Sequence, residues 1–189
     1  HAQELVDASD AAFVHAYDDP DIIAGQGTLG LEMLEQVPDV DTVFVPIGGG
    51  GLISGIATAI KHERPETRVV GVQAAGASTV HESLRKGIPV TLESVSTIAD
   101  GIATGGISEA TLALIDEHVD TVVTVTDTEI ADAIVLLMER AKQVVEGAGA
   151  AGVAAMVAGA DERRVDQRIT IITSQGDLQE PDAEGLRTV

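Results

Sequence analysis

The fold is decided by the stretch Thr42-Val-Phe-Val-Pro46-Ile-Gly48-Gly49-Gly50-Gly51-Leu52, which is followed by Ile53–Lys61. The run Thr42–Ile47 is rich in β-branched residues, which is typical of a strand buried on both faces. The residues Ile53–Lys61 have a helical pattern. Four consecutive glycines are costly in conformational entropy, so a purely structural turn seldom uses them. The stretch therefore predicts a strand, a glycine loop with a binding role, and a helix.

The glycine loop is predicted to bind a phosphate. Without side chains, the amides of Gly48–Gly51 can converge on an anion, and the next helix adds the positive end of its dipole. A mononucleotide loop needs Lys and Ser or Thr after the last glycine, but Leu52 and Ile53 follow. The dinucleotide spacing G-x-G-x-x-G is also missing, and the next strand ends in the neutral Gln73. A lone phosphate on a small cofactor or substrate fits better, and a merely flexible turn is the alternative.

The rest of the chain alternates short apolar runs with helical patterns. The sequence predicts strands at Ala12–His15, Thr42–Ile47, Arg68–Gln73, Thr121–Val125 and Arg168–Thr173. Asp19 before Pro20 opens a helix that runs to about Gln36, and Thr126 with Glu129 forms a capping box. This order predicts an α/β fold, a doubly wound and mostly parallel sheet with helices on both faces. We expect one domain over residues 1–178 and a polar tail over 179–189.

Composition excludes several classes of protein. The chain has 189 residues, of which 44% are hydrophobic, with no cysteine and only three aromatic residues. Disulfide scaffolds, cysteine nucleophiles and base-stacking nucleic-acid modules are therefore disfavoured. No apolar run approaches the ~20 residues of a membrane span, and no signal peptide pattern is present, so a cytoplasmic location is expected.

The net charge is −20, from 31 acidic and 11 basic residues. Such a surface repels itself unless counterions screen it. It is typical either of an ordinary acidic enzyme or, as we favour, of a protein from a salt-rich cytoplasm.

Three polar clusters accompany the glycine loop. Asp100-Gly101 lies in a short turn within an apolar stretch, Glu146 stands at the junction of two helical segments, and Ser174 follows the last predicted strand. Each has an ordinary explanation as a turn, a solvated charge or a helix cap. Their joint presence in one doubly wound sheet favours a single site.

These motifs resemble a known family. Phe13-Val-His15-Ala-Tyr17-Asp-Asp-Pro20-Asp-Ile-Ile-Ala-Gly25-Gln-Gly27-Thr28, the GGGGL loop, Ile98–Ile102, Glu146–Gly149 and Ser174 resemble threonine dehydratase (threonine/serine ammonia-lyase) and serine racemase. Both are pyridoxal-phosphate enzymes related to the tryptophan synthase β-chain. The resemblance extends to about Ser174 and implies the large cofactor domain of that fold without its N-terminal part.

The resemblance also implies roles for individual residues. Pyridoxal 5'-phosphate would be the cofactor, with its phosphate held by Gly48, Gly49, Gly50, Gly51 and Leu52. Ser174 would hydrogen-bond the pyridine nitrogen, Gly101 would line the pocket, and Glu146 would lie near the ring and substrate as the catalytic candidate. The implied reaction converts L-threonine or L-serine into a 2-oxo acid and ammonia.

Two departures from the family pattern matter. The family holds its cofactor as a Schiff base on a lysine in a Ser-x-Lys-x-Arg-Gly segment, and none of Lys61, Lys86 and Lys142 has that context. We therefore expect this chain alone to be inactive and a complementing chain to carry the lysine. Relatives that bind a divalent metal have a carboxylate at the positions of Gln73 and Thr79, so no metal is predicted here.

Several alternatives remain open from the sequence. The chain could have serine racemase-like activity, or could be a non-catalytic phosphate- or cofactor-binding domain that pairs with another chain. The family further implies a homo-oligomer and a place in isoleucine biosynthesis. The composition predicts no nucleic-acid or membrane partner.

Overall fold

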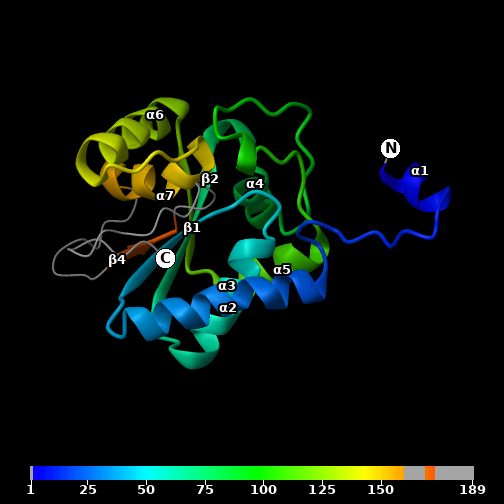
Figure 1. Ribbon diagram of the computed structural model, residues 1–189, viewed down its shortest axis with the longest axis horizontal. Coiled ribbons are helices and arrows are strands. Elements are labelled where there is room, and N and C mark those ends of the chain that lie inside the picture. Colours follow the sequence, from blue (N-terminus) through cyan, green and yellow to red (C-terminus); the bar gives the residue numbers. More distant parts are fainter. Residues whose placement is uncertain (1, 160–168, 173–189) are drawn as a thin grey trace.

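The computed structural model describes residues 2–159 and 169–172 of the chain, and Figure 1 shows their arrangement. Its elements are α1 (Ala2–Asp7), α2 (Pro20–Gln36), β1 (Thr42–Pro46), α3 (Gly51–Glu63), β2 (Arg68–Ala74), η1 (Ala75–Ala77), α4 (Thr79–Lys86), η2 (Asp100–Ile102), α5 (Glu109–His118), β3 (Thr121–Val125), α6 (Asp127–Leu136), the π-helix η3 (Leu137–Ala141), α7 (Gly147–Ala158) and β4 (Ile169–Ile171).

The four strands form one parallel sheet in the order β3-β2-β1-β4. Thr42 of β1 pairs with Arg68 of β2 on one side and with Ile169 of β4 on the other. The chain winds outward from β1 through β2 to β3 and then returns to the opposite side of β1. The predicted doubly wound α/β class is therefore confirmed. In such sheets the crevice at the carboxyl ends, where the winding reverses, is the usual ligand site.

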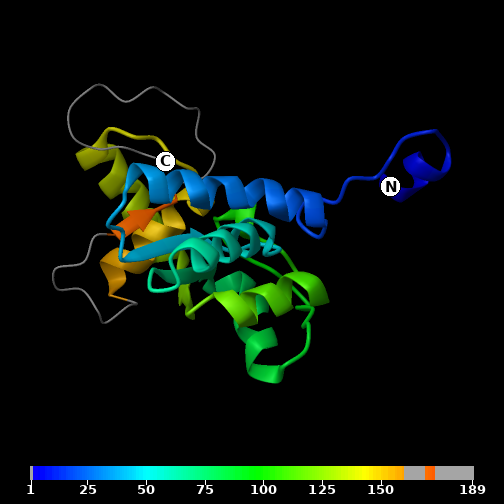
Figure 2. The same ribbon diagram turned by 90° about the horizontal axis from the view of Figure 1, so that it is seen from below.

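Helices cover both faces of the sheet (Figures 1 and 2). One apolar core joins β1 to α2, α3, α4 and α5, and the other joins the sheet to α6 and α7. Val43 and Val45 of β1 belong to the first core, whereas Phe44 between them belongs to the second. This alternation follows from the two-residue period of a strand.

Helices α2 and α3 cross closely because glycines line their contact. A Cβ atom on Gly27 would lie 3.2 Å from the carbonyl oxygen of Gly55, and one on Gly55 would lie 2.6 Å from the amide nitrogen of Gly27. The side chain of Asp19 caps α2 by accepting from the amides of Asp21 and Ile22. The sequence predictions of this helix, of its cap and of the Thr126–Glu129 capping box are confirmed.

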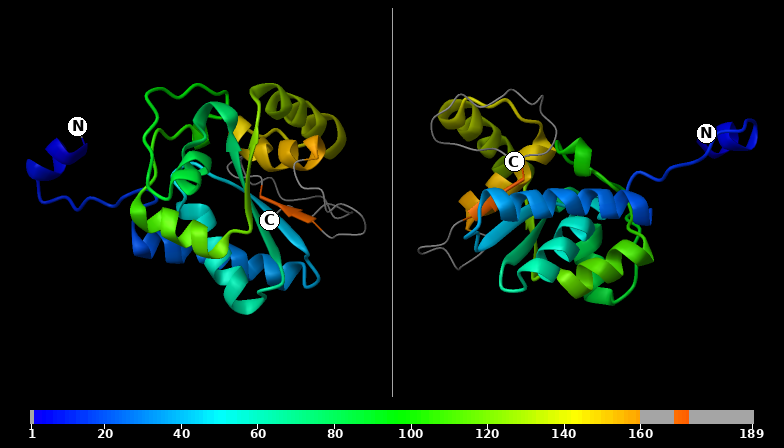
Figure 3. Two further views of the ribbon diagram at one scale, coloured as in Figure 1. Left: turned by 180° about the vertical axis from the view of Figure 1, so that it is seen from behind. Right: turned by 60° about the horizontal axis from the view of Figure 1, so that its bottom comes forward.

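The predicted strand at Ala12–His15 is wrong. This segment has no regular secondary structure and pairs with none of the four described strands, and Phe13 and Val14 are 52% and 64% exposed. Its apolar residues favour a strand locally, but strand formation also needs a neighbouring strand as hydrogen-bond partner. Together with α1 it extends away from the sheet (Figures 1 and 3).

The other strand predictions agree with the structure within two residues at either end. Arg168, Thr173, Ser174 and the predicted tail over 179–189 lie outside the described residues, and the domain boundary at 178 stays a prediction. Among the described helices, none is long and apolar enough to cross a membrane.

Candidate functional site

The glycine loop lies at the carboxyl end of the central strand β1. The amide of Ile47 still donates to the carbonyl of Val72 on β2, at 2.8 Å, and α3 begins at Gly51. Gly50 between them has φ +93°, a left-handed conformation that favours glycine. Because the first amides of a helix have no partner within it, the amides at the start of α3 are available to a ligand.

Three parts of the fold enclose the loop. A Cβ atom on Gly48 would lie 3.2 Å from Cα of Ile102, and one on Gly50 would lie 3.1 Å from Thr111 and Ile115 of α5. A Cβ atom on Gly51 would lie 2.8 Å from backbone and side-chain atoms of Tyr17, whose ring also packs against Gly49. Since side chains would fill these spaces, the close enclosure of the loop needs glycine.

The Asp100-Gly101 turn, predicted as part of the site, lies next to this loop. Cβ of Gly48 would be 3.6 Å from the carbonyl oxygen of Gly101, and Cβ of Gly101 would be 3.1 Å from Oε1 of Glu146. The Asp100 carboxylate accepts from the amide of Gly101 at 3.0 Å. Glycine loop, turn and Glu146 are thus contiguous, although they are far apart in the sequence.

Glu146 is held there by the start of α7. It is the N-cap residue of that helix, but its side chain makes no capping hydrogen bond. Gly147 allows the close approach, because its Cβ atom would be 2.8 Å from the carbonyl oxygen of Ile98. The half-buried carboxylate of Glu146 is therefore directed by packing rather than by capping.

The residues around the loop fit a phosphate-bearing ligand. The loop offers backbone amides and no side chain, which is the donor set that a phosphate needs. The buried hydroxyl of Thr104 has no hydrogen-bond partner within the described part of the chain, and its methyl carbon would lie 3.4 Å from a Cβ atom on Gly48. A buried hydroxyl without a partner beside a loop of backbone amides is consistent with a polar ligand.

Sequence reasoning missed Tyr17, His15 and Thr104 as neighbours of the site. Nδ1 of His15 accepts from the amides of Tyr17 and Asp18, at 3.3 and 2.9 Å. His15 therefore caps these two amides before α2 begins. No local pattern indicates that Tyr17 contacts the glycine loop. Ser174 lies outside the described residues, and Leu52 is half-buried against the first core.

The lysines of the chain lie elsewhere. Nζ of Lys61 is 2.8 Å from the Asp120 carboxylate and donates to the carbonyl of Thr67, at the amino ends of β2 and β3. The glycine loop lies at the opposite ends of the strands, because it follows the carboxyl end of β1. Lys86 is exposed at the end of α4, and Lys142 donates to the carbonyl of Glu139 at 2.7 Å.

Gln73 at the end of β2 is fully buried and makes three hydrogen bonds. Its Nε2 donates to the carbonyl of Ala77 at 3.2 Å and to Oγ1 of Thr79 at 3.4 Å, and its Oε1 accepts from the amide of His81 at 3.0 Å. The amide thus satisfies the polar groups of this turn without an ion. The prediction that no metal binds here stays a prediction.

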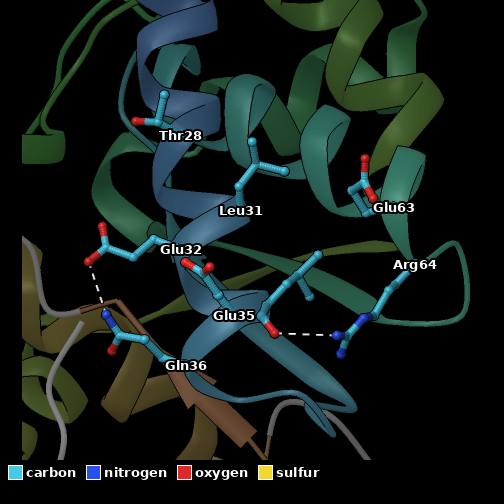
Figure 4. A pocket seen from close by; sticks show the side chains of 8 residues that line it. Thr28, Leu31, Glu32, Glu35, Gln36, Glu63 and Arg64 are labelled. Carbon is cyan, nitrogen blue, oxygen red and sulfur yellow. Dashed lines mark hydrogen bonds between the residues drawn. The ribbon is translucent and has the colours of Figure 1, made fainter.

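Two surface features are distinct from the site. A hydrogen bond from Arg85 holds the pKa of Glu82 below its ordinary value, and this pair lies on α4. Figure 4 shows an open pocket at the C-terminal ends of α2 and α3, lined by Thr28, Leu31, Glu32, Leu34, Glu35, Gln36, Glu63 and Arg64. There Arg64 donates to the carbonyl of Leu34, at the ends of the helices remote from the loop.

Known proteins resemble this chain over most of its length. A family model described as pyridoxal-phosphate dependent enzyme matches residues 1–174. The chain is 46% identical to an L-threonine ammonia-lyase of Thermotoga maritima, covering 94% of this chain and 44% of the relative. It is 42% identical to the catabolic L-threonine dehydratase TdcB of Escherichia coli K12, covering 93% of this chain and 54% of the relative. The chain thus spans about half the length of the curated relatives it matches.

Solved structures share the fold. The threonine deaminase of T.th. superposes with a TM-score of 0.86 at 38% identity, over 95% of this chain and 66% of that one. Maize serine racemase superposes with a TM-score of 0.87 at 37% identity, over 94% and 55% of the two chains.

Proposed function

Because this chain belongs to the family of pyridoxal-phosphate-dependent enzymes, we propose that it is part of a threonine/serine ammonia-lyase. In this reaction L-threonine loses water to give an enamine, and water then hydrolyses the corresponding imine to 2-oxobutanoate and ammonia. The observation that carries the proposal is the enclosed glycine loop at the carboxyl end of β1, in contact with the turn that holds Gly101. The names of the relatives support the choice of substrate.

Each candidate residue has a defined task in this proposal. The amides of Gly48, Gly49, Gly50, Gly51 and Leu52 hold the cofactor phosphate, and Ser174 hydrogen-bonds the pyridine nitrogen. Gly101 leaves room for substrate. Glu146 can hold or accept a proton beside the substrate, because its Oε1 lies 3.1 Å from the Cβ position of Gly101. Pyridoxal phosphate, when bound, supplies the electron sink that lets the hydroxyl group leave.

A lysine from outside this chain completes the site in our proposal. The chain has three lysines, and the ammonium group of Lys61 already pairs with Asp120 at the amino ends of the strands, away from the glycine loop. We propose a second polypeptide segment as partner and assembly into a homo-oligomer. The chain by itself is therefore expected to produce 2-oxobutanoate at a negligible rate.

A cofactor titration tests this proposal. Purified chain at molar salt is titrated with pyridoxal phosphate, reduced with borohydride and digested for peptide mass mapping. Saturable binding without a covalent adduct, together with no 2-oxobutanoate from threonine, is the expected result. A reduced adduct on Lys61, Lys86 or Lys142, or turnover by the chain alone, would contradict the proposed source of the lysine. Absence of saturable binding would contradict the phosphate site itself.

A second candidate activity is racemisation of serine, which the likeness to maize serine racemase favours. Racemisation keeps the amine, whereas elimination releases ammonia, so the products of the completed enzyme distinguish the two. A third candidate is a non-catalytic domain that binds phosphate or cofactor and pairs with another chain. It would bind the cofactor but give neither product after the lysine-bearing segment is added.

We further propose, on the resemblance to threonine dehydratase, that the reaction is a lyase step of isoleucine biosynthesis.

We also propose that the protein works in a salt-rich cytoplasm, and the support for this is its net charge of −20. Raising KCl from about 0.1 M to about 1 M shortens the Debye length from ~10 Å to ~3 Å and weakens the repulsion. The free energy of unfolding in urea is expected to rise by on the order of 2 kcal/mol over this range. Sucrose, which favours compact states without screening charge, is the control. An equal rise in sucrose, or no rise in KCl, would contradict adaptation to salt.

A further inference from the structure

Tyr17 is the residue that contacts the glycine loop most closely from the side of α2. Its ring packs against Gly49, and its Cα, Cβ and carbonyl oxygen lie 2.8 Å from the Cβ position of Gly51. Figure 1 shows the segment before α2 passing beside the start of α3. The half-buried tyrosine therefore contacts two of the four glycines at once.

The other two glycines contact different elements. A Cβ atom on Gly48 would lie 3.2 Å from Ile102, and one on Gly50 would lie 3.1 Å from Thr111 and Ile115. Successive residues of the loop thus alternate between Tyr17 and the pair formed by η2 and α5. The loop therefore lies between Tyr17 on one side and η2 and α5 on the other.

Residues before and after Tyr17 in the sequence fix its position. Nδ1 of His15 accepts from the amides of Tyr17 and Asp18, and the His15 ring stands at right angles to the Tyr17 ring with centroids 4.6 Å apart. Asp19 then caps α2, which is anchored on α3 through their glycine contact. Contacts outside the loop thus help to fix the position of the tyrosine ring.

We propose that Tyr17 is a positioning residue that keeps the amides of the glycine loop converged on a phosphate. The proposal deepens the proposed function and rests on the phosphate site assigned there. A loop of four glycines has a large conformational freedom to lose when it binds an anion. Packing contacts that restrain the loop before the anion binds lower this entropic loss and raise affinity. The ring of Tyr17 makes these contacts, and its hydroxyl group is not needed for them.

Substitution of Tyr17 tests the proposal in the chain as it is. Affinity for pyridoxal phosphate is measured by absorbance titration, and affinity for inorganic phosphate by competition. Tyr17→Ala is expected to weaken both about tenfold, whereas Tyr17→Phe, which keeps the ring, is expected to stay within about twofold of the unaltered chain. Val14→Ala is the control, because this apolar residue of the same segment is 64% exposed and is expected to leave affinity unchanged.

His15 provides a second test should Tyr17→Ala not fold by circular dichroism. His15→Ala keeps the tyrosine but removes the acceptor of two amides, and is expected to weaken phosphate binding. His15→Asn is expected to restore it, because asparagine can accept from amides in the same kind of turn. Unchanged affinity in Tyr17→Ala or His15→Ala, or an equal loss in Tyr17→Phe and Tyr17→Ala, would overturn the role of the ring. Failure of the unaltered chain to bind either probe would instead overturn the phosphate site.

Discussion

Replacing Gly55 with alanine is expected to lower the free energy of unfolding by about 3 kcal/mol, at the upper end of overpacking effects. The new Cβ atom would collide with the carbonyl oxygen of Ile23 and lie 2.6 Å from the amide nitrogen of Gly27. Both are backbone atoms of a capped helix, so neither can turn aside as a flexible side chain would. The helices α2 and α3 must separate, and the core beneath them must open. Urea denaturation at molar KCl measures the change.

Gly25→Ala is the matched control for this substitution. Gly25 also lies in the interior of α2, but nothing is within 4 Å of its Cβ position. Alanine there should be neutral or should stabilise the chain by about 0.5–1 kcal/mol, because it reduces the freedom of the unfolded chain. A small effect of Gly55→Ala, similar to that of Gly25→Ala, would mean that the two helices are not in the close contact described.

Replacing Gly50 with alanine is expected to weaken binding of pyridoxal phosphate about 100-fold. At φ +93° a Cβ atom is strained, so the backbone would relax and rotate the two peptide planes that flank residue 50. If two amides then turn away from the phosphate, at ~1.5 kcal/mol or more for each bond to a charged group, the loss is ~3 kcal/mol, or about 100-fold in affinity. Equilibrium titration of the variant measures this loss.

Gly87→Ala separates this loss from general strain. Gly87 ends α4 with φ +70° and has open space around its Cβ position, so it carries a similar backbone penalty away from the glycine loop. We expect it to destabilise the fold by about 1–2 kcal/mol while cofactor affinity stays unchanged. Titration with pyridoxal, which lacks the phosphate, adds a further comparison, because Gly50→Ala should scarcely alter its binding. Equal losses for both ligands would place the phosphate away from this loop.

The sequence by itself determined the units of the fold. The strand, glycine loop and helix over 42–63 are specified by residues close together in the chain. So are the Asp19 cap of α2 and the Thr126–Glu129 capping box. Each depends on apolar periodicity, on glycine conformation or on a side chain that reaches an amide a few residues away. Such interactions are local, and a pattern in the sequence predicts them directly. The same residues also predicted the parallel sheet, since strands alternate with helices.

The tertiary structure decided which distant residues meet. That Glu146 lies beside Gly101, and Tyr17 against Gly49, follows from the order β3-β2-β1-β4 and from the crossing of α2 on α3. The apolar residues at Ala12–His15 favour a strand, yet the segment pairs with no described strand. Pairing and close approach depend on groups brought together from remote parts of the chain, and their free energy is absent from any local pattern. For this reason the sequence alone predicts the glycine loop and groups Gly101 and Glu146 with it, whereas the contact of Tyr17 with the loop is known only from the folded chain.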